Sequence, residues 1–270
     1  MNDHKFIFIG GLHRSGTSIL FKTLRDHPQI SGFYNTGVPE DEGQHLQTVV
    51  APAKAYGGAG LFGFNKEAHL DETSPLVSEA NRITLFNQWK PYWDLSKPFL
   101  LEKSLPTLIR TRFLQALYPQ SYFIILLRHP IPVTLATKKW RPRRTLYSLL
   151  EHWFVCHERF QQDRQHLRHV MLIKYEEFVT HPAGVLDEIW RFLNVEPMAQ
   201  IKQEVRTNIN EKYFNHWQQL EDGLLSRFYA RFMIQQFEER AGAFGYSLRH
   251  RQSPTSLNLS TGTRLAVKES

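Results

Sequence analysis

The sequence of 270 residues contains a single cysteine, Cys156, and no long hydrophobic run. A lone cysteine cannot form an internal disulfide or a thiolate metal site, which excludes a disulfide scaffold and favours a reducing compartment. The apolar stretch over residues 6–9 is too short for a secretory signal core or a membrane span. The longest apolar block, residues 122–127, has the length of a buried strand. We therefore expect a soluble, cytoplasmic protein.

The composition is also short of the features that mark disordered or repetitive chains. Hydrophobic residues make up 41% and charged residues 22% of the chain, and no repeat is visible. The net charge of +7 indicates an anionic partner, and a basic face could also hold the protein against acidic lipid. Residues 252–270 contain seven Ser or Thr and no aromatic residue. We expect one domain over residues 1–250 and a flexible C-terminal tail over 251–270.

Short apolar strands alternate with amphipathic helices along the chain. The predicted strands cover residues 5–9, 99–101, 122–127 and 170–173, and the predicted helices cover 18–26, 108–117, 146–160 and 185–193. This alternation predicts right-handed crossovers and an α/β fold of the P-loop type, with three layers and a central parallel sheet flanked by helices. The glycine-rich segment 50–75 is either a surface loop or a mobile wall over an acceptor site.

The strongest motif is GLHRSGTS, residues 11–18, which lies between the first predicted strand and helix. Successive backbone amides in such a turn, together with the positive end of the helix, form a cradle for an anion. Glycine is needed where the chain turns sharply and where phosphate approaches the backbone. The residues that we expect to bind phosphate here are His13, Arg14, Ser15, Gly16, Thr17 and Ser18.

This segment differs from a Walker loop in a way that affects its chemistry. The pattern GxxxxGK[ST] fits residues 11–18 except at the lysine position, which holds Thr17, and the positive charge lies at Arg14 instead. The third predicted strand ends in Arg128 rather than in an acid that would support Mg²⁺. The pattern therefore favours phosphate binding without a metal.

These motifs resemble those of the sulfotransferase family, which uses 3′-phosphoadenosine 5′-phosphosulfate (PAPS). Residues 11–18 look like the family's 5′-phosphosulfate loop, with arginine replacing the usual lysine as in the tyrosylprotein branch. FIILLRHP, residues 123–130, is similar to the strand and turn that bind the 3′-phosphate, which implies this role for Arg128. EKSLP, residues 102–106, resembles a lysine-containing strand end of the tyrosylprotein branch. KYEE, residues 174–177, resembles the element that places a tyrosine, here Tyr175, near the adenine.

Two further positions bear on the 3′-phosphate. Residues 208–217 loosely resemble the family's late phosphate-closing segment, which implies contacts from Asn210 and Lys212. The family usually carries a serine eight residues after the arginine, where this chain has Ala136. Either Thr137, which we prefer, or Thr134 replaces that hydroxyl from an adjacent helical position, or the pocket is altered.

The resemblance implies in-line transfer of a sulfuryl group from PAPS to an acceptor hydroxyl. Arg14 and Lys103 would be the cations that stabilise the leaving phosphate, and a carboxylate or histidine would accept the proton. The glycan and tyrosylprotein branches carry a glutamate base in the region of PEDEGQH, residues 39–45. We assign the base to Glu42, and the alternatives in this segment are Glu40, Asp41 and His45. The acids could instead form only the first turn of a helix.

The remaining signals are less specific. Residues 138–144 include five basic side chains, which form a solvated face or contact PAPS, an acidic acceptor or nucleic acid, although we expect no obligate nucleic-acid partner. The thirteen histidines lack the HExxH pattern, so we expect no metal.

The sequence is thus interpreted as a PAPS-dependent sulfotransferase that acts on a saccharide, a lipid headgroup or a tyrosyl hydroxyl. The alternatives are a P-loop kinase or NTPase and a non-catalytic polyanion-binding protein. The sequence does not specify the acceptor or the oligomeric state.

Overall fold

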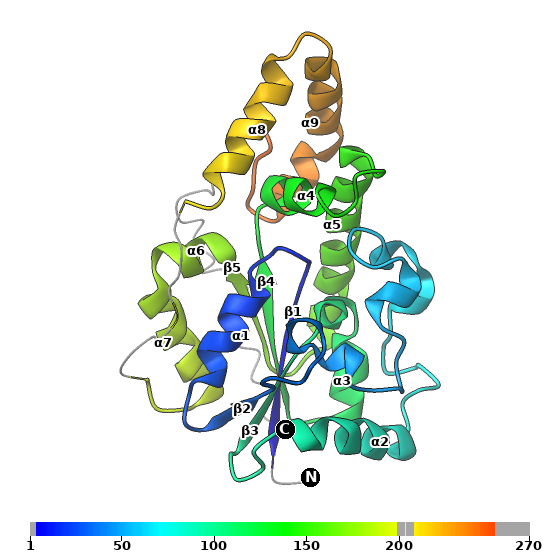
Figure 1. Ribbon diagram of the computed structural model, residues 1–270, viewed down its shortest axis with the longest axis vertical. Helices are drawn as coiled ribbons and strands as arrows, with labels where there is room; N and C mark the ends of the chain where they lie inside the picture. Colours follow the sequence, from blue (N-terminus) through cyan, green and yellow to red (C-terminus); the bar gives the residue numbers. More distant parts are fainter. Residues whose placement is uncertain (1–3, 199–202, 204–207, 252–270) are drawn as a thin grey trace.

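The structure is a computed structural model that describes residues 4–198, 203 and 208–251 (Figure 1). Of the tail predicted over residues 251–270, all but residue 251 lies outside the described residues. The strands form one parallel sheet in the order β2-β3-β1-β4-β5. Their bounds are β1 Lys5–Gly11, β2 Ile30–Gly32, β3 Phe99–Lys103, β4 Ser121–Leu127 and β5 Val170–Lys174. The predicted α/β fold with a central parallel sheet is confirmed.

Helices cover both faces of this sheet, as the unbroken apolar runs of its strands require. Figure 1 shows α1 and α7 on one side of the sheet and α3 and α5 on the other. The helices are α1 Thr17–Arg25, α2 Glu79–Trp89, α3 Thr111–Leu117, α4 Pro130–Lys138, α5 Leu146–Asp163, α6 Tyr175–Thr180, α7 Pro182–Leu193, α8 Glu211–Asp222 and α9 Ser226–Ala243. The hairpin of α8 and α9 stands above the edge at which the strands end (Figure 1). None of the described helices is long and apolar enough to cross a membrane.

The register of the central strands brings their carboxyl ends to one edge. Ile9 of β1 is paired with Lys103 of β3 and with Ile124 of β4, and Gly11 is paired with Leu126. Because the strands are parallel, the segments that follow them emerge at the same edge, where open α/β sheets bind their ligands. The loop after β1, Lys103 at the end of β3 and Arg128 after β4 therefore lie close together.

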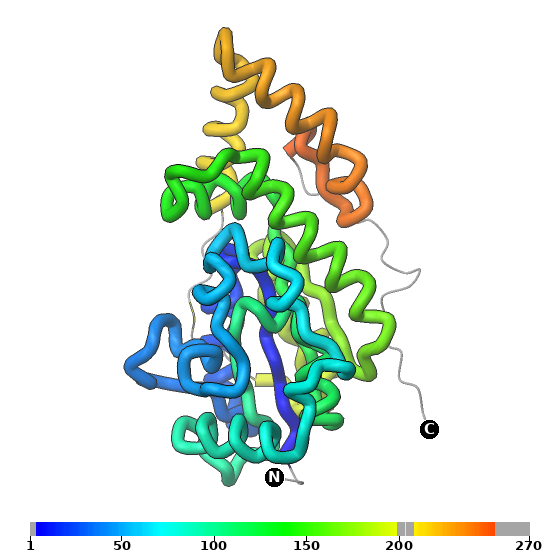
Figure 2. Tube along the Cα trace, turned by 90° about the vertical axis from the view of Figure 1, so that its right-hand side faces the viewer, coloured from blue at the N-terminus to red at the C-terminus, as the bar shows by residue number. Residues whose placement is uncertain are grey.

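The glycine-rich segment 50–75 packs on the face that α5 covers (Figure 2). It consists of three short 3₁₀ turns, Ala53–Tyr56, Phe62–Phe64 and Lys66–Ala68. The Phe62 side chain is fully buried, and the amide of Gly63 donates to Nε2 of His152 at 3.1 Å. A side chain at Gly63 would clash with Cys156 of α5, because its Cβ would lie 2.3 Å from the sulfur. Glycine is therefore required at position 63, where the backbone of the segment packs against α5.

Candidate functional site

A cavity of about 330 Å³ opens at the carboxyl edge of the sheet, between the phosphate loop and β4. Its volume lies within the range of small-molecule sites in proteins. The residues that line it are His13, Arg14, Gly16, Thr17, Ser18, Ile19, Glu40, Glu42, Leu105, Arg128, Trp140, Tyr175 and Ile209. Most of the residues predicted to bind phosphate therefore share one cavity, together with the preferred base.

The loop between β1 and α1 has the backbone of an anion cradle. Arg14 and Gly16 have positive φ angles of 69° and 98°, and Gly16 is the N-cap of α1. The first amides of the helix have no carbonyl of a preceding turn to bind, so they can donate to an anion. A Cβ on Gly16 would lie 2.5 Å from the ring of Tyr175. Glycine is therefore needed both for the conformation of this loop and for its contact with Tyr175.

The side chains of the loop divide between structural and cavity-facing positions. The Ser15 hydroxyl donates to the carbonyl of Leu12 at 2.7 Å, and Ser15 does not line the cavity. His13 lines the cavity, and burial, with smaller effects from Arg141 and Lys103, lowers its pKa to about 4. His13 is therefore neutral at pH 7 and contributes no charge to the site.

Arg14 and Trp140 lie together at the cavity. The guanidinium carbon of Arg14 lies 5.1 Å from the centroid of the Trp140 ring, within cation–π distance. Trp140 remains 55% exposed. The sequence analysis did not predict a role for Trp140, because the run 138–144 was interpreted only by its basic side chains.

Arg128 is buried and held on three sides. Its Nη1 donates to the carbonyl of Arg14 at 2.6 Å, and its Nε donates to Oδ1 of Asn210 at 2.9 Å. Its guanidinium carbon lies 4.2 Å from the centroid of the Tyr175 ring. Burial lowers the pKa of Arg128. These contacts fix the guanidinium within the cavity wall.

Asn210 reaches the site through Arg128 rather than by lining the cavity. Its Nδ2 donates to Oε1 of Glu176 at 2.8 Å, and the same oxygen accepts the amide of His129 at 3.0 Å. The sequence analysis missed this supporting role of Glu176, although it directly follows Tyr175. Lys212 is exposed, and its Nζ lies 5.0 Å from the centroid of the Tyr213 ring.

Thr137 and Thr134 line a different, smaller cavity of about 10 Å³, which they share with His13. Both threonines are buried, and the Thr134 hydroxyl has no hydrogen-bond partner among the described residues. The main cavity and this one meet at His13. The role predicted for Thr137 in 3′-phosphate binding therefore remains a prediction.

Lys103 and Glu42 form a buried ion pair beside the phosphate loop. The Lys103 Nζ lies 3.2 Å from Oε1 of Glu42, and the two side chains are 1% and 8% exposed. The same Nζ lies 3.4 Å from the hydroxyl of Ser18 in the first turn of α1. The other carboxylate oxygen of Glu42 accepts a hydrogen bond from the Gln44 side chain. This arrangement orients an anion and a cation toward the loop.

The other candidates for the base are oriented differently. Glu40 is exposed and accepts a hydrogen bond from the Ser18 hydroxyl at 2.9 Å. Asp41 accepts from the Thr36 hydroxyl at 2.7 Å, and His45 is exposed. These acids do not begin an α-helix, because Pro39–Asp41 is a single 3₁₀ turn in which Glu40 and Asp41 have positive φ angles.

The basic run 138–144 contributes at least one structural contact. Arg141 donates to the carbonyls of Gly57 and Ala59 at 2.6 and 3.0 Å, so it fastens the glycine-rich segment. Lys138 donates to the carbonyl of Pro142 at 2.8 Å. Within the part of the chain that the structure describes, no three His, Cys, Asp or Glu side chains are grouped so that they could hold a metal ion.

Several sulfotransferases are among the solved structures that match this chain. Sulfotransferase STF9 from Mycobacterium avium matches 90% of this chain and 77% of its own, with a TM-score of 0.52 and 12% identity. The sulfotransferase domain of the olefin synthase of Synechococcus PCC 7002 matches 77% of this chain and 82% of its own, with a TM-score of 0.48 and 22% identity. A sulfotransferase from Alicyclobacillus acidocaldarius matches 86% and 94%, with a TM-score of 0.46 and 18% identity.

Among curated proteins, no sequence matches this chain. The family model described as "Sulfotransferase family" matches residues 7–200, which contain the phosphate loop, the Lys103–Glu42 pair and Arg128. The match extends over more than half of the sequence. This chain belongs to the sulfotransferase family.

Proposed function

We propose that the protein transfers a sulfuryl group from PAPS to an acceptor hydroxyl, with Glu42 as the general base. The observation that carries this proposal is the buried contact of 3.2 Å between Lys103 and Glu42, next to the phosphate loop. An acid that is paired with a cation beside the phosphate loop can accept a proton where the donor's sulfate would be transferred.

The residues of the cavity fit the two charged ends of PAPS. The amides at the start of α1 and the Arg14 side chain would hold the 5′-phosphosulfate, and Arg128 would hold the 3′-phosphate. Tyr175 would lie near the adenine, because it contacts both Gly16 and Arg128. The Thr137 hydroxyl and Lys212 are further proposed contacts with the donor.

The transfer step that we propose moves one proton and one sulfuryl group. The acceptor oxygen attacks the sulfur and forms a new O–S bond, while the bond from sulfur to the 5′-phosphate oxygen breaks. The hydroxyl proton passes to the Glu42 carboxylate, and the electron pair of the broken bond remains on the phosphate of 3′,5′-bisphosphoadenosine (PAP). Lys103 and Arg14 stabilise this added negative charge.

The charges at the loop argue for a reaction without Mg²⁺. The lysine position of the Walker pattern holds Thr17, and β4 is followed by Arg128 rather than by a metal-binding acid. Cations of the protein would thus occupy the role that Mg²⁺ has in phosphoryl transfer. The acceptor would be a saccharide, a lipid headgroup or a tyrosyl side chain, each of which offers a hydroxyl.

The test combines binding and transfer. Calorimetry with PAP should show binding in the presence of EDTA, and ³⁵S-labelled PAPS should transfer its label to one of three acceptor pools, glycans, lipids or tyrosine-containing peptides. Turnover of Mg²⁺-ATP without PAP binding would instead support a kinase or NTPase. PAP binding without transfer to any pool would support a non-catalytic binding protein.

A further inference from the structure

The end of β3 contacts the segment around Glu42 with three successive residues. Side chains alternate between the two faces of a strand, so Lys103 points to one side and Glu102 and Ser104 point to the other. Lys103 holds the Glu42 carboxylate, whereas Glu102 and Ser104 contact the backbone of the next two residues. Glu42 is therefore held from both faces of the same strand end.

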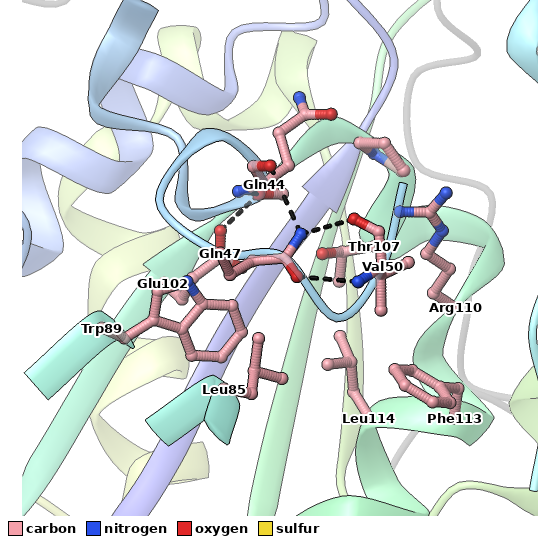
Figure 3. Close-up of a pocket in the computed structure, with 12 residues that line it drawn as sticks. Gln44, Gln47, Val50, Leu85, Trp89, Glu102, Thr107, Arg110, Phe113 and Leu114 are labelled. Carbon is pink, nitrogen blue, oxygen red and sulfur yellow. Dashed lines mark hydrogen bonds between the residues drawn. The ribbon is translucent and has the colours of Figure 1, made fainter. Parts of the chain in front are cut away.

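The backbone contacts are short and buried. The Gly43 amide donates to Oε1 of Glu102 at 3.0 Å, and the Gln44 amide donates to the Ser104 hydroxyl at 2.8 Å. That hydroxyl in turn donates to the same oxygen of Glu102. Figure 3 shows Gln44 and Glu102 beside a small cavity on this side of the segment.

Gly43 and Gln44 connect these backbone contacts to the Glu42 side chain. A Cβ on Gly43 would lie 2.5 Å from Oε1 of Glu102, so only glycine allows the contact. The Gln44 side chain donates to the free oxygen of the Glu42 carboxylate and accepts the Ala53 amide at 2.8 Å. The positions of the two amides thus set the position of the carboxylate.

We propose that Glu102 is a positioning residue, which aligns the Glu42 carboxylate with Lys103 by holding the Gly43 and Gln44 amides through Oε1 and Ser104. The inference rests on the proposed function, because it treats Glu42 as the base. Glu102 itself does not face the main cavity and takes no part in the transfer.

The protonation state of Glu102 follows from its surroundings. Burial and the negative charge of Glu42 raise its pKa to about 8, against the lowering effects of Ser104 and Lys103. Arg110, which lines the same small cavity, is the other charged group that faces this side. The adjoining volume of about 30 Å³ is large enough for one water molecule. Above pH 8, ionised Glu102 would repel Glu42 and disturb the alignment.

The first experiment measures the hydrogen bonding of the Gly43 amide in the absence of substrate. The ¹⁵N–¹H resonance of Gly43 should titrate near pH 8 in the wild-type protein and should not titrate in Glu102→Gln, which keeps an acceptor oxygen. Hydrogen exchange of the Gly43 amide should be at least about tenfold faster in Glu102→Leu, because its acceptor is removed. A Gly43 resonance that titrates equally in the wild type and in Glu102→Gln would overturn the proposal.

The second experiment measures how the Glu102 variants change kcat and the Kd for PAP. At pH 7, Glu102→Gln should keep kcat within about threefold, and Glu102→Leu should lose about tenfold or more with an unchanged Kd for PAP. Above pH 8 the wild-type kcat should fall by about tenfold per pH unit, and this fall should be absent in Glu102→Gln. Full kcat in folded Glu102→Leu, or the same alkaline fall in both proteins, would contradict the proposal.

The two proposals fail in different ways. If Glu42→Gln keeps full kcat, the base is another residue and the proposed mechanism fails, whereas the Gly43 titration still tests the hold of Glu102 on the backbone. If the titration is absent but Glu42→Gln is inactive, the base assignment stands and the positioning role is wrong. Glu67→Gln supplies a matched control, because the Glu67 side chain is exposed and lies outside residues 42–44 and 102–104.

Discussion

Arg128 donates through Nε to Oδ1 of Asn210 at 2.9 Å and thereby joins the end of β4 to the start of α8. The amide nitrogen of the same Asn210 side chain, Nδ2, donates to Oε1 of Glu176 at 2.8 Å. The hairpin of α8 and α9 is thus linked to the wall of the main cavity through two polar contacts. The guanidinium of Arg128 is oriented before any donor binds.

Replacing Arg128 by lysine should weaken PAP binding by about 10- to 100-fold, because hydrogen bonds to charged groups contribute about 1.5–3 kcal/mol each. Lysine keeps the charge but cannot reproduce the planar contacts with Asn210 and Arg14. Isothermal titration calorimetry measures the change. The exposed Arg168 offers a matched control, and Arg168→Lys should bind PAP as the wild type does. Equal affinities for both variants would exclude Arg128 from the donor site.

Glu42→Gln should reduce kcat by about 10²- to 10⁴-fold, which is the usual contribution of a general base. The Kd for PAP should change little, because the amide fills the same volume. Initial rates with ³⁵S-labelled PAPS give the result. Glu40→Gln serves as the comparison. If that variant loses the activity and Glu42→Gln keeps it, the base is Glu40.

Lys103→Met should destabilise the fold by about 3–5 kcal/mol, because it leaves the Glu42 carboxylate buried without its cation. The double variant Glu42→Gln with Lys103→Met should recover most of this loss, since both charges are then removed, but it should remain inactive. Urea denaturation at pH 7 measures both free energies of unfolding. A double variant as unstable as the single one would mean that the pair is not coupled.

Gly16→Ala should weaken PAP binding and lower the free energy of unfolding by about 1–3 kcal/mol, because the residue has a φ of 98° and its Cβ would meet the Tyr175 ring. Gly242 in α9 provides the control, since a Cβ there meets nothing within 4 Å. Gly242→Ala should be neutral or stabilising by about 0.5–1 kcal/mol. Thermal unfolding with and without PAP separates the two effects.

The protein should lose stability as the pH falls below about 6.5. Burial lowers the pKa of four histidines to about 3 or 4, namely His13, His129, His152 and His157. Below pH 6.5 the unfolded chain binds protons that the folded chain does not, so each such histidine costs about 1.4 kcal/mol per pH unit. Urea unfolding at pH 7, 6 and 5 should show this slope. His157→Gln should make it shallower, and His216→Gln, at an exposed position, should leave it unchanged.

The sequence was sufficient to predict the phosphate loop and the strands that are continuous apolar runs, because each is encoded by a short contiguous pattern. β2 was not predicted, since Ile30–Gly32 is too short to show a pattern. Arg128 was found because it directly follows a recognisable strand. The contact of Glu102 with Gly43 could not be foreseen, because it joins positions 59 residues apart that no local spacing relates.

Other features depend on side-chain orientation, which sequence spacing does not fix. Four neighbouring residues were candidates for the base, and only the fold shows that the Glu42 side chain is the buried one. Thr137 was expected near the 3′-phosphate by its helical position, and in the structure it lines a smaller cavity that shares His13 with the main one. Its role in 3′-phosphate binding stays a prediction. The cytoplasmic location and the three acceptor classes stay predictions.

The separation of 3.2 Å between Lys103 and Glu42 ties two events of the proposed reaction to one another. While the carboxylate is ionised, it masks the ammonium, so the pair carries no net charge. Uptake of the acceptor's proton neutralises the carboxylate and unmasks the ammonium at the moment when the departing phosphate gains charge. The timing of electrostatic support would then be set by the substrate's own proton, with no movement of the backbone.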